Sequence, residues 1–457
     1  MKTKLSWQQW LTIIVFGLIG QLAWAVENME FNLFLFNRIG GSAGDIAAMV
    51  ACSAAVSTIA TLVGGIISDR MGHRRYFLCI GYVVWGIMTA LFALISREHT
   101  AVLFPGMSTA KVLAMTVTIV IVMDCIMSFC GSLANDASFN AWVTETSDET
   151  NRGTIEGVLN VFPLLAMLIV AGTGSILSSL LGWPAFFIVI GAGVSVAGLS
   201  GLLFVPDTKP VQSKEKMNFW ESIVYGFRPS VIRENAKFYL CLLGICIFNI
   251  SVQVFMPYLL IYLEKTLGFG DALSGLVMAV IIIFASICSL AVGRLVDRYG
   301  KRTLAFISIS LYCIGLFAAG FLTSVIPFII AGIIMMTGYV SILILFSSAI
   351  RDETPVDHVG MFQGIRLLAY VLVPMIIGPM IGSGLINAVS TQTYVNSYGE
   401  TVLLPVGVLF TASAVVGLLL YFFAFRFPKQ TKKGGRCEAA DKVGVVNEIL
   451  DENPDRF

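Results

Sequence analysis

The sequence predicts an all-α polytopic membrane protein with twelve transmembrane helices in two six-helix halves. Of its 457 residues, 57% are hydrophobic and only 12% are charged, whereas soluble proteins carry about 25% charged residues. Twelve apolar runs are long enough to cross a bilayer, and one charged turn motif occurs in both halves of the chain. The formal net charge of +1 gives no reason to expect a nucleic-acid partner or a strongly acidic one.

The apolar runs are the main basis for this fold class, because a helix crosses the hydrocarbon core in about 20 apolar residues. Proline and glycine inside several runs are tolerated, since neighbouring helices satisfy the freed backbone groups. The expected helices cover residues 10–37, 44–67, 76–96, 111–134, 155–180, 184–205, 238–263, 271–293, 303–323, 326–349, 362–387 and 402–426.

The distribution of lysine and arginine predicts the orientation of these helices. If the N-terminus is cytoplasmic, all but four of the 29 basic residues fall in cytoplasmic segments. The exceptions are Arg38, Arg97, Lys111 and Lys265. We therefore expect a multi-pass protein of the cell membrane, plasma or inner, with both termini in the cytoplasm.

The start of the chain also has features of a signal peptide. Lys2 and Lys4 precede a short apolar run, and Ala23-Trp24-Ala25 is similar to a cleavage site. However, the apolar run continues to Phe36, and cleavage would leave eleven helices, in conflict with the distribution of basic residues. The sequence therefore predicts that the first helix is retained.

A charged turn follows the second expected helix of each half. Both copies have the pattern G-x-x-x-D-R-x-G-x-R and lie about half a chain length apart. Glycine lets the chain bend close to a neighbouring helix. The acid and the arginines could form charge pairs that break as the halves move, or they could simply staple the loop. The residues are Gly65, Asp69, Arg70, Gly72 and Arg74 in the first copy and Gly293, Asp297, Arg298, Gly300 and Arg302 in the second.

The repeat divides the chain into two halves joined by a charged linker. The expected parts are an N-terminal half (1–205), a cytoplasmic linker (206–237), a C-terminal half (238–426) and a polar, disordered tail (427–457). Twelve helices, two halves and the doubled turn resemble the major facilitator superfamily. The resemblance implies a monomeric solute transporter whose halves rock around a site at the membrane midplane. Arg152 and Arg366 are further candidates for gating charges at the cytoplasmic side.

The first expected helix carries a polar face. Amides and carboxylates pair with hydroxyl groups, and an indole ring stacks on a sugar ring, so this face predicts a hydroxylated solute such as a sugar. Trp24 alone could be a packing residue, and Glu30 could simply be exposed near the outer surface. The residues at helical spacing are Gly17, Gln21, Trp24, Asn28 and Asn32, with Glu27 one step further round.

Asp124 is expected near the membrane midplane, because it lies about thirteen residues, or ~20 Å, beyond Lys111. An acid there costs about 2.5–3.5 kcal/mol on insertion scales and is a functional candidate by default. Glu27 and Asp124 are therefore the candidates for cation coupling and for substrate contact. Asp124 could instead be a structural carboxylate paired with Ser128 or Asn135 on the same face.

The second half offers fewer polar candidates. Asn249 and Gln253 share one face of the seventh expected helix, and Tyr370 lies one turn after Arg366 in the eleventh. These side chains could complete a hydrogen-bonding site. The two amides could equally join helices, which is a common use of amides in membrane bundles.

No cofactor is expected. Eight of the nine cysteines lie in apolar runs and the three histidines lie outside them, so no metal-site pattern is present. No Walker A motif is found. The fourth-helix Asp124 and the acidic loop ending at Arg152 are similar to the glycoside–pentoside–hexuronide:cation symporters and the related sucrose–proton group. From Ile46 to Ile67 the second helix has no acid, whereas the sodium-using members have paired acids there, which favours a proton over sodium as the coupling ion.

Four functions are compatible with these observations. The favoured one is a proton-coupled symporter of a sugar or glycoside. A drug efflux antiporter of the same fold is the alternative, since the 18 methionines and 32 phenylalanines suit a large apolar cavity. A membrane-embedded enzyme would need a catalytic cluster in a membrane-face loop, and the acidic loop from Asn135 to Arg152 has no His, Cys or DxD motif. A non-transporting sensor of this fold is the fourth.

Overall fold

A computed structural model describes residues 5–71, 74–147, 151, 155, 158–159, 161–207, 227–299, 301–353 and 365–425. Its description includes the side chains in these ranges except those of residues 65–71, 175, 179, 289–299, 301 and 351–352. The predicted linker is therefore described only at its ends, and the predicted tail (427–457) lies outside the described residues, as do Gly72, Arg152 and Gly300.

The first half is helical through almost all of its described length. Several membrane helices continue through π-helical turns, in which one extra residue widens the helix; such turns are frequent at functional sites. The elements are α1 (Trp7–Val26), a π-helical turn (Glu27–Phe31), α2 (Asn32–Phe34), a second π-helical turn (Leu35–Ile39), α3 (Ala43–Met71), α4 (Arg74–Leu91), a 3₁₀ turn (Phe92–Leu94), α5 (Arg97–Leu103), α6 (Thr109–Gly131), a π-helical segment (Ser132–Phe139), α7 (Asn140–Thr146) and α9 (Phe162–Phe204).

The second half repeats this pattern and adds a β-hairpin. Its elements are α11 (Pro229–Glu234), α12 (Ala236–Phe255), a 3₁₀ turn (Met256–Tyr258), α13 (Leu259–Ile261), a π-helical turn (Tyr262–Thr266), α14 (Gly270–Tyr299), α15 (Lys301–Ala319), α16 (Val325–Asp352), a π-helical turn (Leu368–Leu372), α18 (Val373–Val389), strands β1 (Thr393–Val395) and β2 (Thr401–Leu403), α19 (Val408–Leu418) and α20 (Leu420–Ala424).

The helices agree with the twelve expected membrane segments. Within the described residues, ten helical segments are long and apolar enough to span a membrane, and residues 162–178 and 408–424 form two shorter apolar helices at the fifth and twelfth expected positions. The fifth and sixth helices run together as α9, which bends where Gly182 takes a φ of 75° and Pro184 follows. The protein is thus an all-α multi-pass membrane protein, as predicted.

Two expected boundaries are wrong. The fourth helix does not end at residue 134, because helical structure continues to Thr146. The polar residues after Gly131 lie within this helical structure and do not begin a loop. The twelfth helix does not begin at residue 402. Residues 401–403 pair with residues 393–395 in an antiparallel hairpin, in which β-branched and aromatic side chains favour extended structure.

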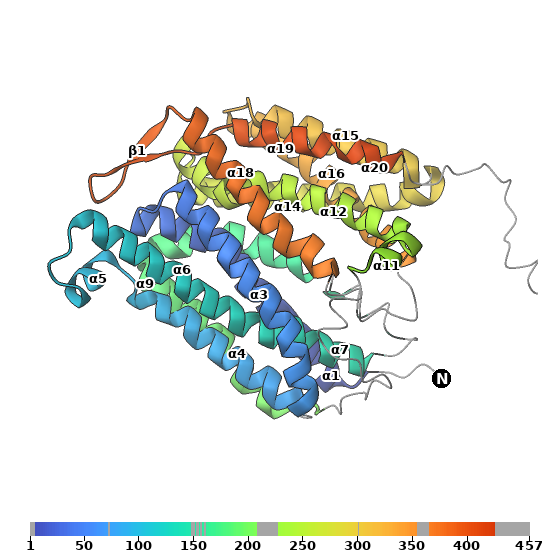
Figure 1. Ribbon diagram of the computed structural model, residues 1–457, viewed down its shortest axis with the longest axis horizontal. Coiled ribbons are helices and arrows are strands. Elements are labelled where there is room, and N and C mark those ends of the chain that lie inside the picture. The colour runs from blue at the N-terminus through green and yellow to red at the C-terminus, as the bar shows by residue number, and fades with distance from the viewer. Residues whose placement is uncertain are drawn as a thin grey trace, which may run out of the picture.

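The two halves lie one above the other in Figure 1, the first half coloured blue to green and the second yellow-green to red. They pack together through α3 against α18 and through α9 against α14. A Cβ atom on Gly275 would clash with the carbonyl oxygen of Ala171, so glycine is what permits this close approach between the second pair of helices.

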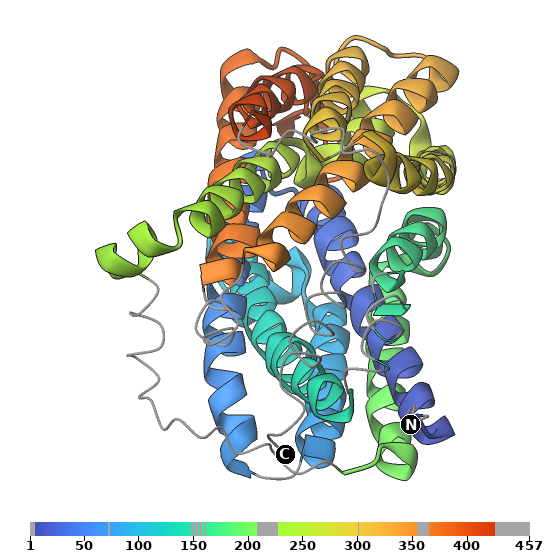
Figure 2. The ribbon, with the colours of Figure 1, turned by 90° about the vertical axis from the view of Figure 1, so that its right-hand side faces the viewer.

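The bundle has two distinct ends. One carries α5 and the β1–β2 hairpin, and we call it the hairpin end (Figure 1). The other carries the start of α1, α11 and the end of α20, and we call it the terminal end (Figures 1 and 2). Both ends of the described chain therefore lie on one side of the bundle, as an even number of membrane crossings requires.

Candidate functional site

A cavity of about 420 Å³ lies between the two halves. Its walls come from α1, α12, α14, α16 and the segment that contains Tyr370. This location between helix bundles and this size are typical of ligand sites. The polar or hydroxyl-bearing side chains in its walls are Gln21, Trp24, Asn28, Asn32, Asn249, Gln253, Tyr312, Tyr339 and Tyr370.

The structure brings together most of the residues predicted to contact substrate. All but two of the eight line this one cavity, although they come from both halves and are up to 349 positions apart. The six are Gln21, Trp24, Asn28, Asn249, Gln253 and Tyr370.

The first half gives the cavity its polar wall. The side-chain amide of Asn28 donates to the Trp24 carbonyl, and that of Asn32 donates to the Asn28 carbonyl, both at 2.8 Å. Asn32 is buried, and its Oδ1 has no hydrogen-bond partner within the described residues. Because a buried acceptor without a partner is costly, this oxygen is well suited to accept a hydrogen bond from a bound solute.

The second half gives the cavity a largely apolar wall. Asn249 donates to the Tyr370 carbonyl at 3.2 Å and so joins two helices while it also lines the cavity. The Tyr370 hydroxyl lies 3.3 Å from the Ser347 hydroxyl. Most of the remaining lining is apolar and rich in sulfur and aromatic rings: Phe255, Met256, Met278, Phe328, Met335, Met336, Met375 and Phe410. These residues could not be predicted from the sequence, because an apolar residue that faces a cavity is of the same type as one that faces lipid.

The two predicted coupling acids do not line the cavity. Glu27 begins the first π-helical turn and accepts a hydrogen bond from the Ser128 hydroxyl at 2.8 Å. Asp124 is buried, lies within electrostatic reach of Glu27 and within hydrogen-bonding reach of Ser53. Oε2 of Glu27 and Oδ1 of Asp124 have no hydrogen-bond partner within the described residues. The pair therefore forms a separate acidic site, in which Asp124 is buried and Glu27 is half-buried.

A third acid, Asp136, was not predicted from the sequence. Asp136 lies in the π-helical segment and accepts a hydrogen bond from Asn135 at 3.0 Å, with Trp24 also within hydrogen-bonding reach. The Oδ1 atom of Asn135 accepts from the Tyr82 hydroxyl at 2.8 Å. The expected end of the helix at residue 134 concealed Asp136. The lack of Gly and Pro from residue 132 to residue 146 was the signal that the helix could continue past it.

Glu30 is not exposed near the outer surface, which corrects the expectation for it. Its side chain is fully buried against α9, where a Cβ atom on Gly174 would clash with its carboxylate. The close packing of the first and fifth helices continues toward the hairpin end and encloses this acid.

The charged turns are described only in part. The backbones of Gly65, Asp69, Arg70, Gly293, Asp297 and Arg298 lie in the last turns of α3 and α14. Arg74 contacts Glu145 through Nε and Nη2, at 3.0 and 2.9 Å, within the first half. The Arg302 guanidinium lies 5.5 Å from the Phe425 ring, and that of Arg366 lies 5.9 Å from the Tyr370 ring. Arg74 thus makes a contact within one half, as a staple would.

Within the described residues, no group of three His, Cys, Asp or Glu side chains lies close enough to hold a metal ion.

Residues 10–270 and 241–446 match the sequence profile described as Major Facilitator Superfamily. The chain belongs to the major facilitator superfamily. Solved structures agree: a mutant of the nucleoside transporter NupG aligns with a TM-score of 0.69, at 12% identity, over 91% of this chain and 98% of NupG. A bacterial homolog of the human lysosomal transporter Spinster aligns with a TM-score of 0.61, at 13% identity, over 92% of this chain and 97% of that one.

A curated relative aligns with a smaller part of the chain. The multi-drug resistance efflux pump PmrA homolog of Lactococcus lactis subsp. lactis (strain IL1403) is 23% identical over 270 residues. The alignment covers 57% of this chain and 63% of that protein, which is less than two thirds of its length. Family membership and the solved structures identify the chain as a small-solute transporter in a lipid membrane, and not as an enzyme.

Proposed function

We propose that this transporter carries out proton-coupled symport of a glycoside, whose sugar lies on the polar wall of the cavity and whose apolar aglycone lies on the opposite wall. The observation that carries this proposal is the division of the cavity. The amides of its polar wall, Gln21, Asn28 and Asn32, come from the first half, whereas its methionine and aromatic side chains come mainly from the second.

The chemistry of each wall supports one part of such a solute. Amide groups hydrogen-bond hydroxyl groups in pairs, and Gln21, Asn28 and Asn32 follow one another along the first membrane segment, in α1, the π-helical turn and α2. Trp24, beside them, offers an indole face to a sugar ring. Methionine and aromatic side chains adapt to flat or irregular apolar groups, so they suit an aromatic aglycone. Nucleosides are N-glycosides of this kind, and the fold of NupG supports including them among the candidates.

The acids Glu27 and Asp124 support coupling to a cation. Two negative charges that share a membrane interior are far more costly than one, so binding of a cation there is favoured. Their hydrogen-bonding groups include the hydroxyls of Ser53 and Ser128, and the second expected helix has no acid from Ile46 to Ile67. This small set of ligands is better suited to a proton than to sodium, which prefers several oxygen ligands.

The proposal includes an orientation. We place the terminal end in the cytoplasm of a cell whose plasma or inner membrane holds a monomer, since basic residues concentrate at that end.

A second candidate is a drug efflux antiporter. The methionine-rich wall of the cavity favours it, and the relative named as a multi-drug resistance efflux pump supports it. The polar wall from the first half and the acceptor of Asn32 have no obvious use for a purely lipophilic solute, so this candidate ranks second.

The test uses proteoliposomes with a pH-sensitive dye inside. Aryl glycosides and nucleosides added outside should acidify the lumen, whereas free monosaccharides should act more weakly because they leave the apolar wall unused. A pH difference of two units would support accumulation of up to about 100-fold for one proton per solute, at 1.36 kcal/mol per unit. Asp124→Asn should abolish accumulation, and Asp271→Asn, a control outside the cavity in the first turn of α14, should retain it.

Other outcomes separate the alternatives. Alkalinisation by lipophilic cations with no response to glycosides would favour the efflux antiporter. Solute binding with no movement of solute or protons would indicate a sensor. Acidification that occurs without sodium in the wild type and persists in Asp124→Asn would remove that residue from the coupling role.

A further inference from the structure

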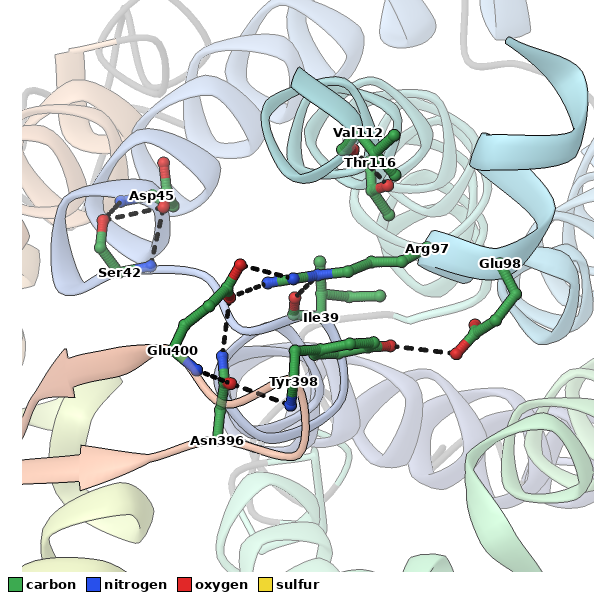
Figure 3. A network of polar contacts seen from close by, with 10 residues as sticks. All are labelled: Ile39, Ser42, Asp45, Arg97, Glu98, Val112, Thr116, Asn396, Tyr398 and Glu400. Atoms are coloured by element: carbon green, nitrogen blue, oxygen red, sulfur yellow. Dashed lines mark hydrogen bonds and ion pairs between the residues drawn. The ribbon is translucent and has the colours of Figure 1, made fainter. Parts of the chain in front are cut away.

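Arg97 is the most extensively bonded cation at the hairpin end of the molecule (Figure 3), within the part of the chain that the structure describes. It begins α5, and only 4% of its surface is exposed. Its Nη1 and Nη2 atoms donate to the two oxygens of Glu400, at 2.9 and 2.5 Å, and its Nε donates to the Ile39 carbonyl at 2.7 Å. The guanidinium carbon lies 3.9 Å from the centre of the Tyr398 ring. Glu400 and Tyr398 belong to the second half, so this cluster joins the two halves.

The β1–β2 hairpin holds its side of the cluster in place without help from the first half. Oδ1 of Asn396 accepts hydrogen bonds from the backbone N–H groups of Tyr398 and Glu400, at 3.0 and 2.9 Å. Its Nδ2 donates to Oε2 of Glu400 at 3.0 Å. These bonds orient the carboxylate before Arg97 arrives, and the planar fork of a guanidinium matches such a carboxylate in two parallel bonds.

Weaker contacts surround this cluster and close the same end. The Tyr398 hydroxyl donates to Glu98 at 3.3 Å, and the Tyr258 hydroxyl donates to the Ala43 carbonyl at 3.2 Å. Phe36 stacks on Tyr394 with ring centres 6.3 Å apart. Each of these contacts also joins one half to the other.

The cluster also reaches the helix that carries the polar wall of the cavity. Ile39 is the last residue of the second π-helical turn, and Gly40 follows it with a φ of 80°. A Cβ atom on Gly40 would clash with the side chains of Arg97 and Asn396. Arg97 thus holds the end of the first membrane helix, and the hairpin of the other half, at the same time.

We propose that Arg97 and the β1–β2 hairpin form a latch that keeps the hairpin end shut and that must release before the cavity can open there. The latch does not depend on which solute is carried or on the coupling ion, so it goes beyond the proposed function. Because it is bidentate and shielded by an aromatic ring, and because Arg97 is buried although the Glu400 side chain is 32% exposed, we expect it to hold the halves more strongly than a fully exposed ion pair. Its release frees the end of the first membrane helix in the same step.

Hydrogen–deuterium exchange of the protein in nanodiscs tests the latch without a solute. Arg97→Met should raise exchange at least tenfold in residues 33–50 and 256–266, at the hairpin end, and lower it in residues 7–14 and 236–243, at the terminal end, because one end closes as the other opens. Arg97→Lys, which keeps the charge but loses the bidentate geometry, should lie between Arg97→Met and the wild type. Lys111→Met removes an exposed cation from the same end of the same half and should change neither region.

The opposite changes in exchange at the two ends decide the test. Faster exchange confined to the hairpin and α5, with the terminal end unchanged, would show a local structural staple and overturn the proposal. Unchanged exchange at both ends in Arg97→Met would overturn it as well. Neither result would bear on the glycoside proposal, which rests on the cavity.

Discussion

Removal of the Glu145 charge is expected to destabilise the first half far more than removal of an exposed acid. Glu145, in α7, pairs with Arg74 at the start of α4, and their side chains are only 8% and 4% exposed. Glu98, by contrast, lies 3.5 Å from Arg38, with side chains 57% and 39% exposed. The two pairs therefore offer a matched comparison of a buried and an exposed ion pair in one protein.

The structure sets the size of the difference. Breaking a buried ion pair by neutralising one member costs about 3–5 kcal/mol. An exposed pair contributes about 0–1 kcal/mol. Glu145→Gln should thus lower the free energy of unfolding by at least about 2 kcal/mol more than Glu98→Gln, which corresponds to about a 30-fold difference in the unfolding equilibrium constant.

Reversible unfolding in mixed micelles of increasing SDS content provides the measurement. A double variant, Arg74→Met with Glu145→Leu, removes both charges and should recover much of the lost stability, since apolar replacement of a buried pair is often neutral. Equal effects of Glu145→Gln and Glu98→Gln would refute the reasoning. So would a double variant less stable than Glu145→Gln, because the penalty would then not come from the loss of the Arg74–Glu145 charge pair.

The hairpin end, the helix packing and the cavity wall each give a further expected outcome. Hydrogen bonds from Arg97 hold the pKa of Glu400 below its ordinary value of about 4.5. The Arg97–Glu400 ion pair should therefore persist from about pH 8 to about pH 5 and be lost only at lower pH. Hydrogen exchange of the hairpin, measured as a function of pH, checks this. Gly275→Ala should lower the thermal midpoint by several degrees, because its new Cβ meets backbone, whereas Gly193→Ala, with open space around it, should not. Asn32→Leu should raise the KM for a transported glycoside at least tenfold with little change in protein level, as uptake kinetics would show.

The polar part of the cavity could be predicted from the sequence because amides are rare in apolar runs and must face something other than lipid. Helical spacing then placed Gln21, Trp24 and Asn28 on one face, and Asn249 with Gln253 on another. The meeting of these faces in one cavity follows from the pairing of the halves, which the doubled turn motif indicated.

The remaining part of the site depends on features that side-chain type does not reveal. A π-helical turn adds a residue and rotates the rest of its helix, and such turns begin at Glu27 and contain Asp136 and Tyr370. Simple helical spacing is therefore unreliable at these acids, and it could not show that Glu27 and Asp124 do not line the cavity. The hairpin was missed because its short strands come directly after an apolar helix. In the sequence, its partner Arg97 is recognisable only as one of the few basic residues outside the cytoplasmic segments.

A cavity with one wall in each half has a consequence for which molecules can pass. When the halves separate at one end, a solute that contacts both walls must give up some contacts on one of them, so it works as a temporary bridge that each half shares. A molecule that binds a single wall would be held equally well in every state and would not favour movement. A long, rigid molecule that spans both walls too tightly would instead hold the halves together, and the difference between cargo and inhibitor would then be one of length and stiffness more than of affinity.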